Sequence, residues 1–197
     1  MNQHYKNTIV VDVHSRKEWR QWLQRNHEKE KSAWLVIYHK HSGKSTLDYA
    51  QAVEEALCFR WIDSVANKRD QESAYQYFSQ RKPESKWSRS NRERVERLIN
   101  DGLMTDAGQA LIDYAMANGN WEALEDVQNN ILPEDLQQLL KKNKKAEQNF
   151  NAFPPPSKRM ILGWIQNAKK EETRKKRIEE TVALAEKNIK ANHPLKK

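Results

Sequence analysis

The chain has 197 residues, of which 35 are Lys or Arg and 27 are Asp or Glu, giving a formal charge of +8. Its mean hydropathy is −1.04, yet it contains seven Trp, six Tyr and four Phe. The aromatic content argues against an intrinsically disordered chain, and the absence of a run of about 20 apolar residues excludes a membrane span.

The charge and the cysteine count indicate a compartment and a class of partner. The single cysteine, Cys58, excludes an internal disulfide and suits a reducing compartment. The first 15 residues contain no apolar core of a signal peptide, so we expect a cytoplasmic protein. The positive charge favours an anionic small molecule or nucleic acid as partner, although such a charge is also typical of a protein that simply stays soluble.

The first third of the chain predicts two strands around a helix. Residues 8–13 are apolar and mostly β-branched, as in a short strand. Ser15 and Glu18 have the spacing of a capping box, in which each side chain satisfies a free backbone amide at a helix start. Residues 33–38 form a continuous apolar run, which is typical of a strand buried on both faces.

A second helix and two extended segments follow. Asp48 and Gln51 predict another capping box. The predicted inner face of this helix consists of Tyr49, Val53, Ala56 and Leu57. Residues 61–64 are typical of an extended segment, and residues 75–78 of a strand. Pro83 ends that strand, because it has no amide hydrogen to donate to a sheet.

From residue 88 onward the signals are almost all helical. Ser90 and Glu93 predict a capping box, and Gly102 can end that helix in the left-handed conformation. Thr105 is placed to cap the next helix, and Pro133 suits the first turn of another.

Residues 153–156, Phe-Pro-Pro-Pro, predict a stiff extended connector. Ser157 would cap the helix after it, and residues 172–190 predict a final helix. The predicted fold class is α+β, with a small mixed β-sheet and helices in the N-terminal half and a helical C-terminal half. We place the domains at 1–125, an α+β core, and 126–197, a helical region.

Residues with chemical potential concentrate in two stretches, ALCFRWIDS (56–64) and RKPESKWSRSN (81–91). The candidate ligand site consists of Trp61, Asp63, Ser64, Arg81, Ser85, Trp87, Ser88 and Asn91. Arg81 can form a forked contact with an anionic group. Asp63 is suited to be a general base, a helix cap or a partner of Arg81. Trp87 is either a flat wall for a ligand or a hydrophobic plug beside a solvated basic face.

Two basic faces offer a second interpretation. Residues 81–97 carry seven Lys or Arg side chains against three Glu, and residues 169–177 carry six Lys or Arg side chains. Such faces can bind nucleic acid phosphates. In the second of them, Glu residues at helical spacing favour internal ion pairs as the alternative.

Three other patterns are incomplete, and we predict no cofactor and no metal. The run from Gly43 to Thr46 (GKST) mimics the end of a P-loop, but Tyr38 stands where the motif needs Gly. His39 and His41 have no further ligands nearby. Cys58 is more typical of a core residue than of a nucleophile, although a nearby Arg60 would favour a thiolate.

Several motifs resemble the YdeI/OmpD-associated family, also called bacteriocin-protection proteins. ALCFRWIDS, RKPESKWSRSN and GLMTDAG (102–108) are similar to the family's ALCFGWIDG, to its P-x-S-x-W-S-x-x-N run and to its G-x-M-T-x-x-G element. Residues 168–178 look like its AK-x-x-ETR-x-x-RI helix. Arg60 and Gln80 depart from the usual Gly and Pro. The resemblance implies protection against bacteriocins or cationic antimicrobial peptides, but the positive charge disfavours direct capture of a cationic peptide.

Our leading hypothesis is a cytoplasmic, non-enzymatic protein of the YdeI/OmpD-associated type. It would bind an anion or another ligand at the candidate site and act in stress or antimicrobial protection. One alternative is a nucleic-acid-binding protein that uses the basic faces 81–97 and 169–177. The other is a hydrolase-like enzyme that acts on a small anionic substrate with Asp63 as base.

Overall fold

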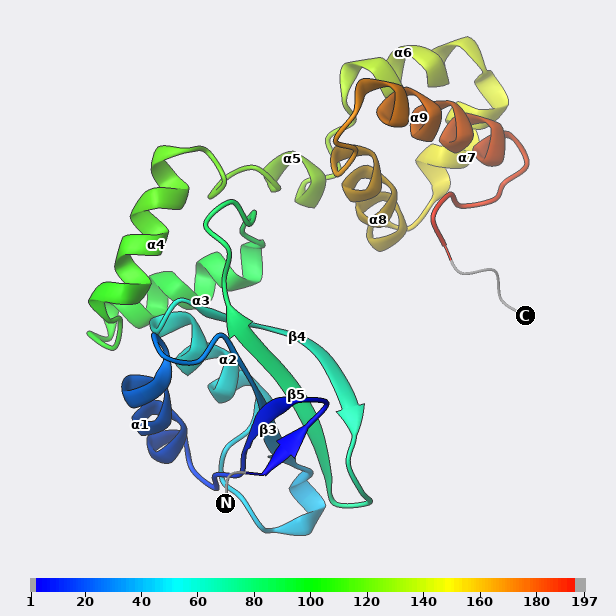
Figure 1. Cartoon of the computed structure of the whole chain (residues 1–197). Helices are drawn as coiled ribbons and strands as arrows, with labels where there is room; N and C mark the ends of the chain where they lie inside the picture. The colour runs from blue at the N-terminus through cyan, green and yellow to red at the C-terminus, as the bar shows by residue number, and fades with distance from the viewer. Residues whose placement is uncertain (1–2, 194–197) are drawn as a thin grey trace. The chain divides into compact units, whose positions relative to one another are not determined.

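The chain divides into two compact units, Met1–Glu122 and Ala123–Lys197, and the computed structural model describes residues 3–193 of it. The N-terminal unit combines a sheet with helices, whereas the described part of the C-terminal unit is helical (Figure 1). Each unit has a hydrophobic core of its own. This arrangement confirms the predicted α+β class.

A five-stranded mixed sheet forms the base of the N-terminal unit, with the strand order β1-β2-β3-β5-β4. The strands are β1 (His4–Tyr5), β2 (Thr8–Val11), β3 (Ser32–Tyr38), β4 (Trp61–Lys68) and β5 (Ser73–Gln80). β2 and β3 pair in parallel, and the other neighbours pair antiparallel. The strand predicted at residues 8–13 therefore ends two residues early, and the extended segment predicted at residues 61–64 grows into all of β4.

The central strand β3 has the burial expected of a strand covered on both faces. Residues 33–36 are all buried, whether they face the helices or the opposite side. At the edge of the sheet, the pairing of β4 with β5 shifts between Asp63 and Ala66. This bulge leaves Ser64 and Val65 exposed, and Val65 keeps 58% of its surface in solvent.

Four helices complete the N-terminal unit: α1 (Arg16–Asn26), α2 (Tyr49–Cys58), α3 (Arg89–Asn100) and α4 (Asp106–Ala117), with a short 3-10 turn η1 (Lys40–Ser42). Figure 1 shows α1 and α2 beside the sheet. Trp19 and Leu23 of α1 pack with Phe78 of β5 in the core.

The helix caps agree in part with the predictions. Asp48 and Gln51 form the complete predicted capping box of α2, and the Thr105 side chain caps α4. Ser15 caps α1, but the Glu18 carboxylate accepts from the amide of His14 rather than from Ser15. The cap of α3 is Ser88, so the predicted box at Ser90 is wrong.

Tyr49 was predicted on the inner face of α2, and this prediction is also wrong. Tyr49 is 45% exposed, whereas Val53, Ala56 and Leu57 are buried as predicted. It directly follows the cap residue Asp48, so it occupies the first position of α2. The first turn of the helix starts outside the core, which accounts for its exposure.

The C-terminal unit contains α5 (Glu125–Gln128), α6 (Glu134–Lys142), α7 (Lys144–Ala152), α8 (Pro155–Gln166) and α9 (Glu171–Glu186). Its core gathers apolar side chains of α6 to α9, including Leu140, Phe150, Ile161 and Val182. The helix predicted at residues 172–190 thus ends four residues earlier.

The predicted connector at residues 153–156 is shorter than expected. Pro154 occupies the cap position and Pro155 begins α8, because proline needs no amide partner in the first turn of a helix. Ser157 consequently lies inside α8 and is buried, so its predicted role as the cap is wrong.

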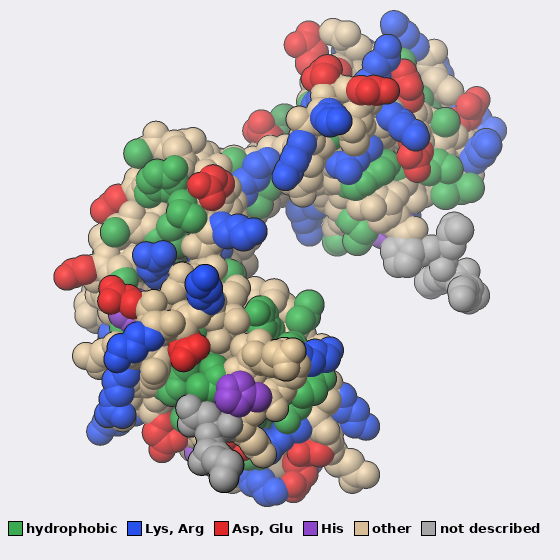
Figure 2. Space-filling model, in the orientation of Figure 1, with side chains coloured by type: hydrophobic (Ala, Val, Ile, Leu, Met, Phe, Trp, Pro, Cys, Tyr) green, Lys and Arg blue, Asp and Glu red, His purple; other side chains and the backbone are tan. Residues whose placement is uncertain are grey.

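Lys and Arg side chains are interspersed with Asp and Glu side chains on the visible face of each unit (Figure 2). Among residues 3–193, no helix has both the length and the apolar character needed to cross a membrane.

Candidate functional site

The two tryptophans of the candidate site are core residues. Trp61 is fully buried, and its indole Nε1 donates to the carbonyl of His27 at 3.1 Å. Trp87 is 2% exposed and packs against Trp121, with 5.1 Å between the ring centroids. Neither ring offers a free face to a ligand. Both rings instead pack in the core beneath the segments that carry the other candidate residues.

Arg81 organises the loop that follows β5, which we call the Arg81 loop (residues 81–88). Its amide donates to the carbonyl of Arg60 at 2.8 Å, and its Nη2 donates to the carbonyl of Lys86 at 2.7 Å. The guanidinium carbon lies 3.9 Å from the centroid of the Trp87 ring, within range of a cation–π contact. The loop therefore closes around its own first side chain.

The charge of Arg81 has little compensation inside the protein. The residue is 5% exposed, forms no ion pair with any carboxylate in the described part of the chain, and its buried Nε has no hydrogen-bond partner. Burial lowers the pKa of Arg81 to about 10, and the negative charge of Asp63 acts against this decrease. Burying a charge without an ion pair costs free energy, and a bound anion would reduce that cost.

Asp63 lies on β4 and faces the start of α2. The Tyr49 hydroxyl donates to its carboxylate at 2.6 Å. Burial and this hydrogen bond raise the pKa of Tyr49 to about 12, so the phenol keeps its proton. Asp63 is thus within electrostatic range of Arg81 but does not form an ion pair with it.

The remaining polar residues of the candidate site lie in two segments of the chain, the Arg81 loop with the start of α3 and the bulge of β4. Ser88 and Asn91 meet in the first turn of α3, where the Ser88 hydroxyl accepts from the Asn91 amide at 3.4 Å. Ser85 lies in the Arg81 loop, and its amide donates to the carbonyl of Lys82 at 3.0 Å. Ser64 lies apart from them in the exposed bulge of β4.

Sequence reasoning missed two residues of this region. Tyr49 holds the carboxylate of Asp63, and Arg94 donates to the side chain of Asn91 at 3.0 Å. The position of Tyr49 directly after a helix cap is a signal that could have placed it outside the core. Arg94 lies three residues after Asn91, which is a favourable spacing for contact on a helix.

Some cations of each basic face are buried or make contacts within the protein. In residues 81–97, Arg81 is buried and Arg97 pairs with Glu54. In residues 169–177, Arg174 forms a two-pronged ion pair with Asp135. Arg177 donates to the carbonyl of Trp164 and lies over its ring. Apart from these residues, the cations of the second face are all lysines, which make no forked contacts, whereas the first face also contains Arg89, Arg92 and Arg94.

Cys58 lies at the end of α2 in the core. Burial raises the pKa of Cys58 to about 11, and the adjacent Glu55 acts in the same direction. The groups that oppose this increase are Arg20 and Arg16, not Arg60 as the sequence suggested. Arg60 instead has a positive φ of 58°, a conformation that favours glycine, which explains the Gly of the family pattern at this position.

The residues match two known families. Residues 11–111, just over half of the chain, match the family described as "Domain of unknown function (DUF8412)". The chain belongs to this family. Residues 129–188 match "Bacteriocin-protection, YdeI or OmpD-Associated", which confirms that resemblance. The helical unit therefore carries a YdeI/OmpD-associated domain.

Of the motifs that carried the resemblance, the one at residues 168–178 lies inside the YdeI/OmpD-associated domain, whereas the other three lie within residues 11–111. The candidate site therefore belongs to the DUF8412 region. Neither the curated proteins nor the solved structures contain a significant match to the chain.

Proposed function

We propose that the protein is a cytoplasmic, non-enzymatic binding protein that takes up a small anion beside Arg81 and acts in stress or antimicrobial protection. The description of the family matched by residues 129–188 supports the protective role. One observation carries the binding role. Arg81 is a buried cation that lacks an ion pair with any described carboxylate and has an unpartnered Nε.

The energetics of burial support an anion at this position. A charge removed from water is costly unless it is paired and hydrogen-bonded. The backbone carbonyl of Lys86 satisfies one nitrogen of Arg81 but brings no negative charge. A phosphate or carboxylate oxygen that accepts from Nε would provide both the missing hydrogen bond and the counter-charge.

The residues around Arg81 fit supporting roles. Ser88 caps α3, a 12-residue helix whose first turn contains Asn91, and the N-terminus of a helix favours negative charge. Ser85 is half-buried in the same loop and would supply a hydroxyl. Asp63 would keep Arg81 oriented through its charge, and Trp61 and Trp87 would hold the two segments from the core.

The test is calorimetric titration with inorganic phosphate and pyrophosphate, using the wild type, Arg81→Lys and Lys17→Gln. Lysine keeps the charge but lacks Nε and the forked geometry, so we expect Arg81→Lys to weaken binding about tenfold or more. Lys17 is exposed on α1, and Lys17→Gln controls for a uniform loss of charge. Unchanged affinity in Arg81→Lys, with an unchanged melting temperature, would exclude this assignment.

The same titration separates the two alternatives. A single-stranded oligonucleotide that binds with a steep dependence on salt, while phosphate and pyrophosphate do not bind, would favour nucleic-acid recognition. Catalysis with Asp63 as base stays a hypothesis. It predicts that Asp63→Asn abolishes turnover of an anionic ester while anion binding and the melting temperature persist.

A further inference from the structure

A pocket in the C-terminal unit has a composition unlike that of the Arg81 loop. Its volume is about 200 Å³. Its walls are mainly apolar, formed by Val127, Ile131, Leu132, Pro133, Leu162 and Ile165. A cavity of about 150 Å³ lined by apolar side chains can hold a benzene ring. The pocket therefore has room for an aromatic ring with a short chain attached.

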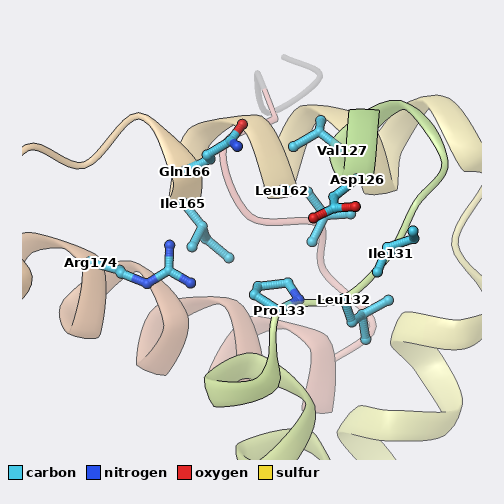
Figure 3. A pocket seen from close by; sticks show the side chains of 9 residues that line it. All are labelled: Asp126, Val127, Ile131, Leu132, Pro133, Leu162, Ile165, Gln166 and Arg174. Atoms are coloured by element: carbon cyan, nitrogen blue, oxygen red, sulfur yellow. The ribbon is translucent and has the colours of Figure 1, made fainter. Parts of the chain in front are cut away.

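Three polar side chains complete the lining: Asp126, Gln166 and Arg174. Figure 3 shows Asp126 and Arg174 on opposite sides of the pocket, with Ile165 and Pro133 between them. The two charges are not equivalent. Arg174 is committed to Asp135, with its Nε 2.7 Å and its Nη2 2.9 Å from the two carboxylate oxygens.

The carboxylate of Asp126 has no such commitment. It is exposed to solvent, and none of the described residues forms an ion pair with it. The charged residues of the lining are Asp126 and Arg174, and Asp135, which is not part of the lining, neutralises Arg174. Asp126 is therefore the charge of the lining that stays uncompensated by an ion pair among the described residues.

Gln166 adds a buried acceptor that has no hydrogen-bond donor. Its Nε2 donates to the carbonyl of Ala123 at 2.6 Å, which leaves Oε1 buried without a donor. Gln166 is also the last residue of α8, and the C-terminus of a helix favours positive charge. The polar groups that line the pocket therefore favour a ligand that donates hydrogen bonds and carries a positive charge.

We propose that this pocket binds a small apolar molecule that carries a protonated primary amine. The apolar body packs against Leu162, Ile165 and Pro133, and the ammonium group donates to the carboxylate of Asp126. Seven of the nine lining residues lie within the stretch that matches the YdeI/OmpD-associated family, whereas Asp126 and Val127 lie just before it. The proposal does not depend on the anion site of the N-terminal unit.

Three probes of nearly equal shape test the charge preference: 2-phenylethylamine, 2-phenylethanol and 3-phenylpropanoate. Each is titrated into the full-length, isotope-labelled protein and followed by amide NMR shifts. We expect the amine to saturate, with its largest shifts at Val127, Leu132 and Ile165. The alcohol should bind several-fold more weakly, because it lacks the charge-assisted hydrogen bond, and the carboxylate should bind most weakly.

Asp126→Asn removes the counter-charge and keeps the shape of the side chain. It should reduce the affinity for the amine to that for the alcohol, whereas Glu125→Gln, the same charge change one residue earlier and outside the lining, should leave it within about twofold. The proposal is overturned if the amine does not saturate, if the three probes bind equally, if the carboxylate binds most tightly, or if the two variants behave alike.

Discussion

Two buried charged side chains of the N-terminal unit have opposite surroundings. Glu55 is 2% exposed, and its carboxylate oxygens lie 2.5 Å from Arg16 Nε and 2.7 Å from Arg20 Nη1. Arg81 is nearly as buried but has no ion pair among the described residues. Glu55 is paired with two arginines, and the contrast supports the proposal that Arg81 binds an anion.

Cys58 provides a prediction at the same scale. Because its side chain is fully buried and its pKa is about 11, the thiolate fraction at pH 8 is roughly one in a thousand. We expect no detectable reaction of the native protein with a disulfide reagent over minutes, and one equivalent of reaction in urea. The native rate should rise about tenfold per pH unit up to pH 10. A rapid native reaction at pH 8 would contradict the burial and the pKa.

Individual residues also mark the limits of prediction from sequence. The capping box of Asp48 and Gln51 was predictable because it depends on residues three positions apart. The choice between Ser88 and Ser90 as the cap of α3 was not predictable. The residue before Ser88, Trp87, is held by a hydrogen bond from its amide to the carbonyl of Asn120, which lies far along the chain. The burial of Arg81 was equally inaccessible, since arginine is rarely buried without a partner.

At the scale of elements, two helical glycines predict opposite effects of the same substitution. A Cβ at Gly108 of α4 would lie 2.4 Å from the carbonyl oxygen of Cys58, which is backbone and cannot move aside freely. We expect Gly108→Ala to destabilise the N-terminal unit by about 1–3 kcal/mol. A Cβ at Gly163 of α8 would meet only Val127 at 3.8 Å.

Gly163→Ala should therefore stabilise the C-terminal unit by about 0.5–1 kcal/mol, because alanine is the better helix former. Urea unfolding followed by circular dichroism measures both free energies. The same sign of change for the two variants would contradict either the close contact at Gly108 or the open space at Gly163.

The ion pair between α6 and α9 predicts a dependence on pH. The hydrogen bond from Arg174 lowers the pKa of Asp135, so the unfolded chain binds this proton more tightly than the folded unit does. The pair therefore stabilises the fold above the unfolded pKa of about 3.9, and this contribution is lost as the pH falls through the lower folded pKa. Asp135→Asn should lower the melting temperature at pH 7 and have little effect at about pH 2.

Glu179→Gln is the matched control for that experiment, since Glu179 is exposed on α9 and an exposed charge contributes little. An equal loss in Asp135→Asn at both pH values would indicate a role for the Asp135 side chain other than ion pairing.

At the scale of the whole molecule, the two cores share no residue. The domain boundary predicted between residues 125 and 126 stays a prediction, and fragments test it. We expect fragments 1–122 and 123–197 each to unfold cooperatively, at the denaturant midpoint that the corresponding unit has in the full chain. A fragment without a cooperative transition would show that its unit needs the other one to fold.

The bulge in β4 has a consequence for how the molecule behaves in a crowded solution. β4 is the longer edge strand of the sheet, and a regular edge of eight residues is a template for a strand of another chain. The shift at Ser64 and Val65 breaks the row of free backbone groups, and the charge of Lys68 stands at its end. The edge is thereby protected against strand-by-strand polymerisation, so concentrated protein should not nucleate amyloid-like fibrils from this sheet.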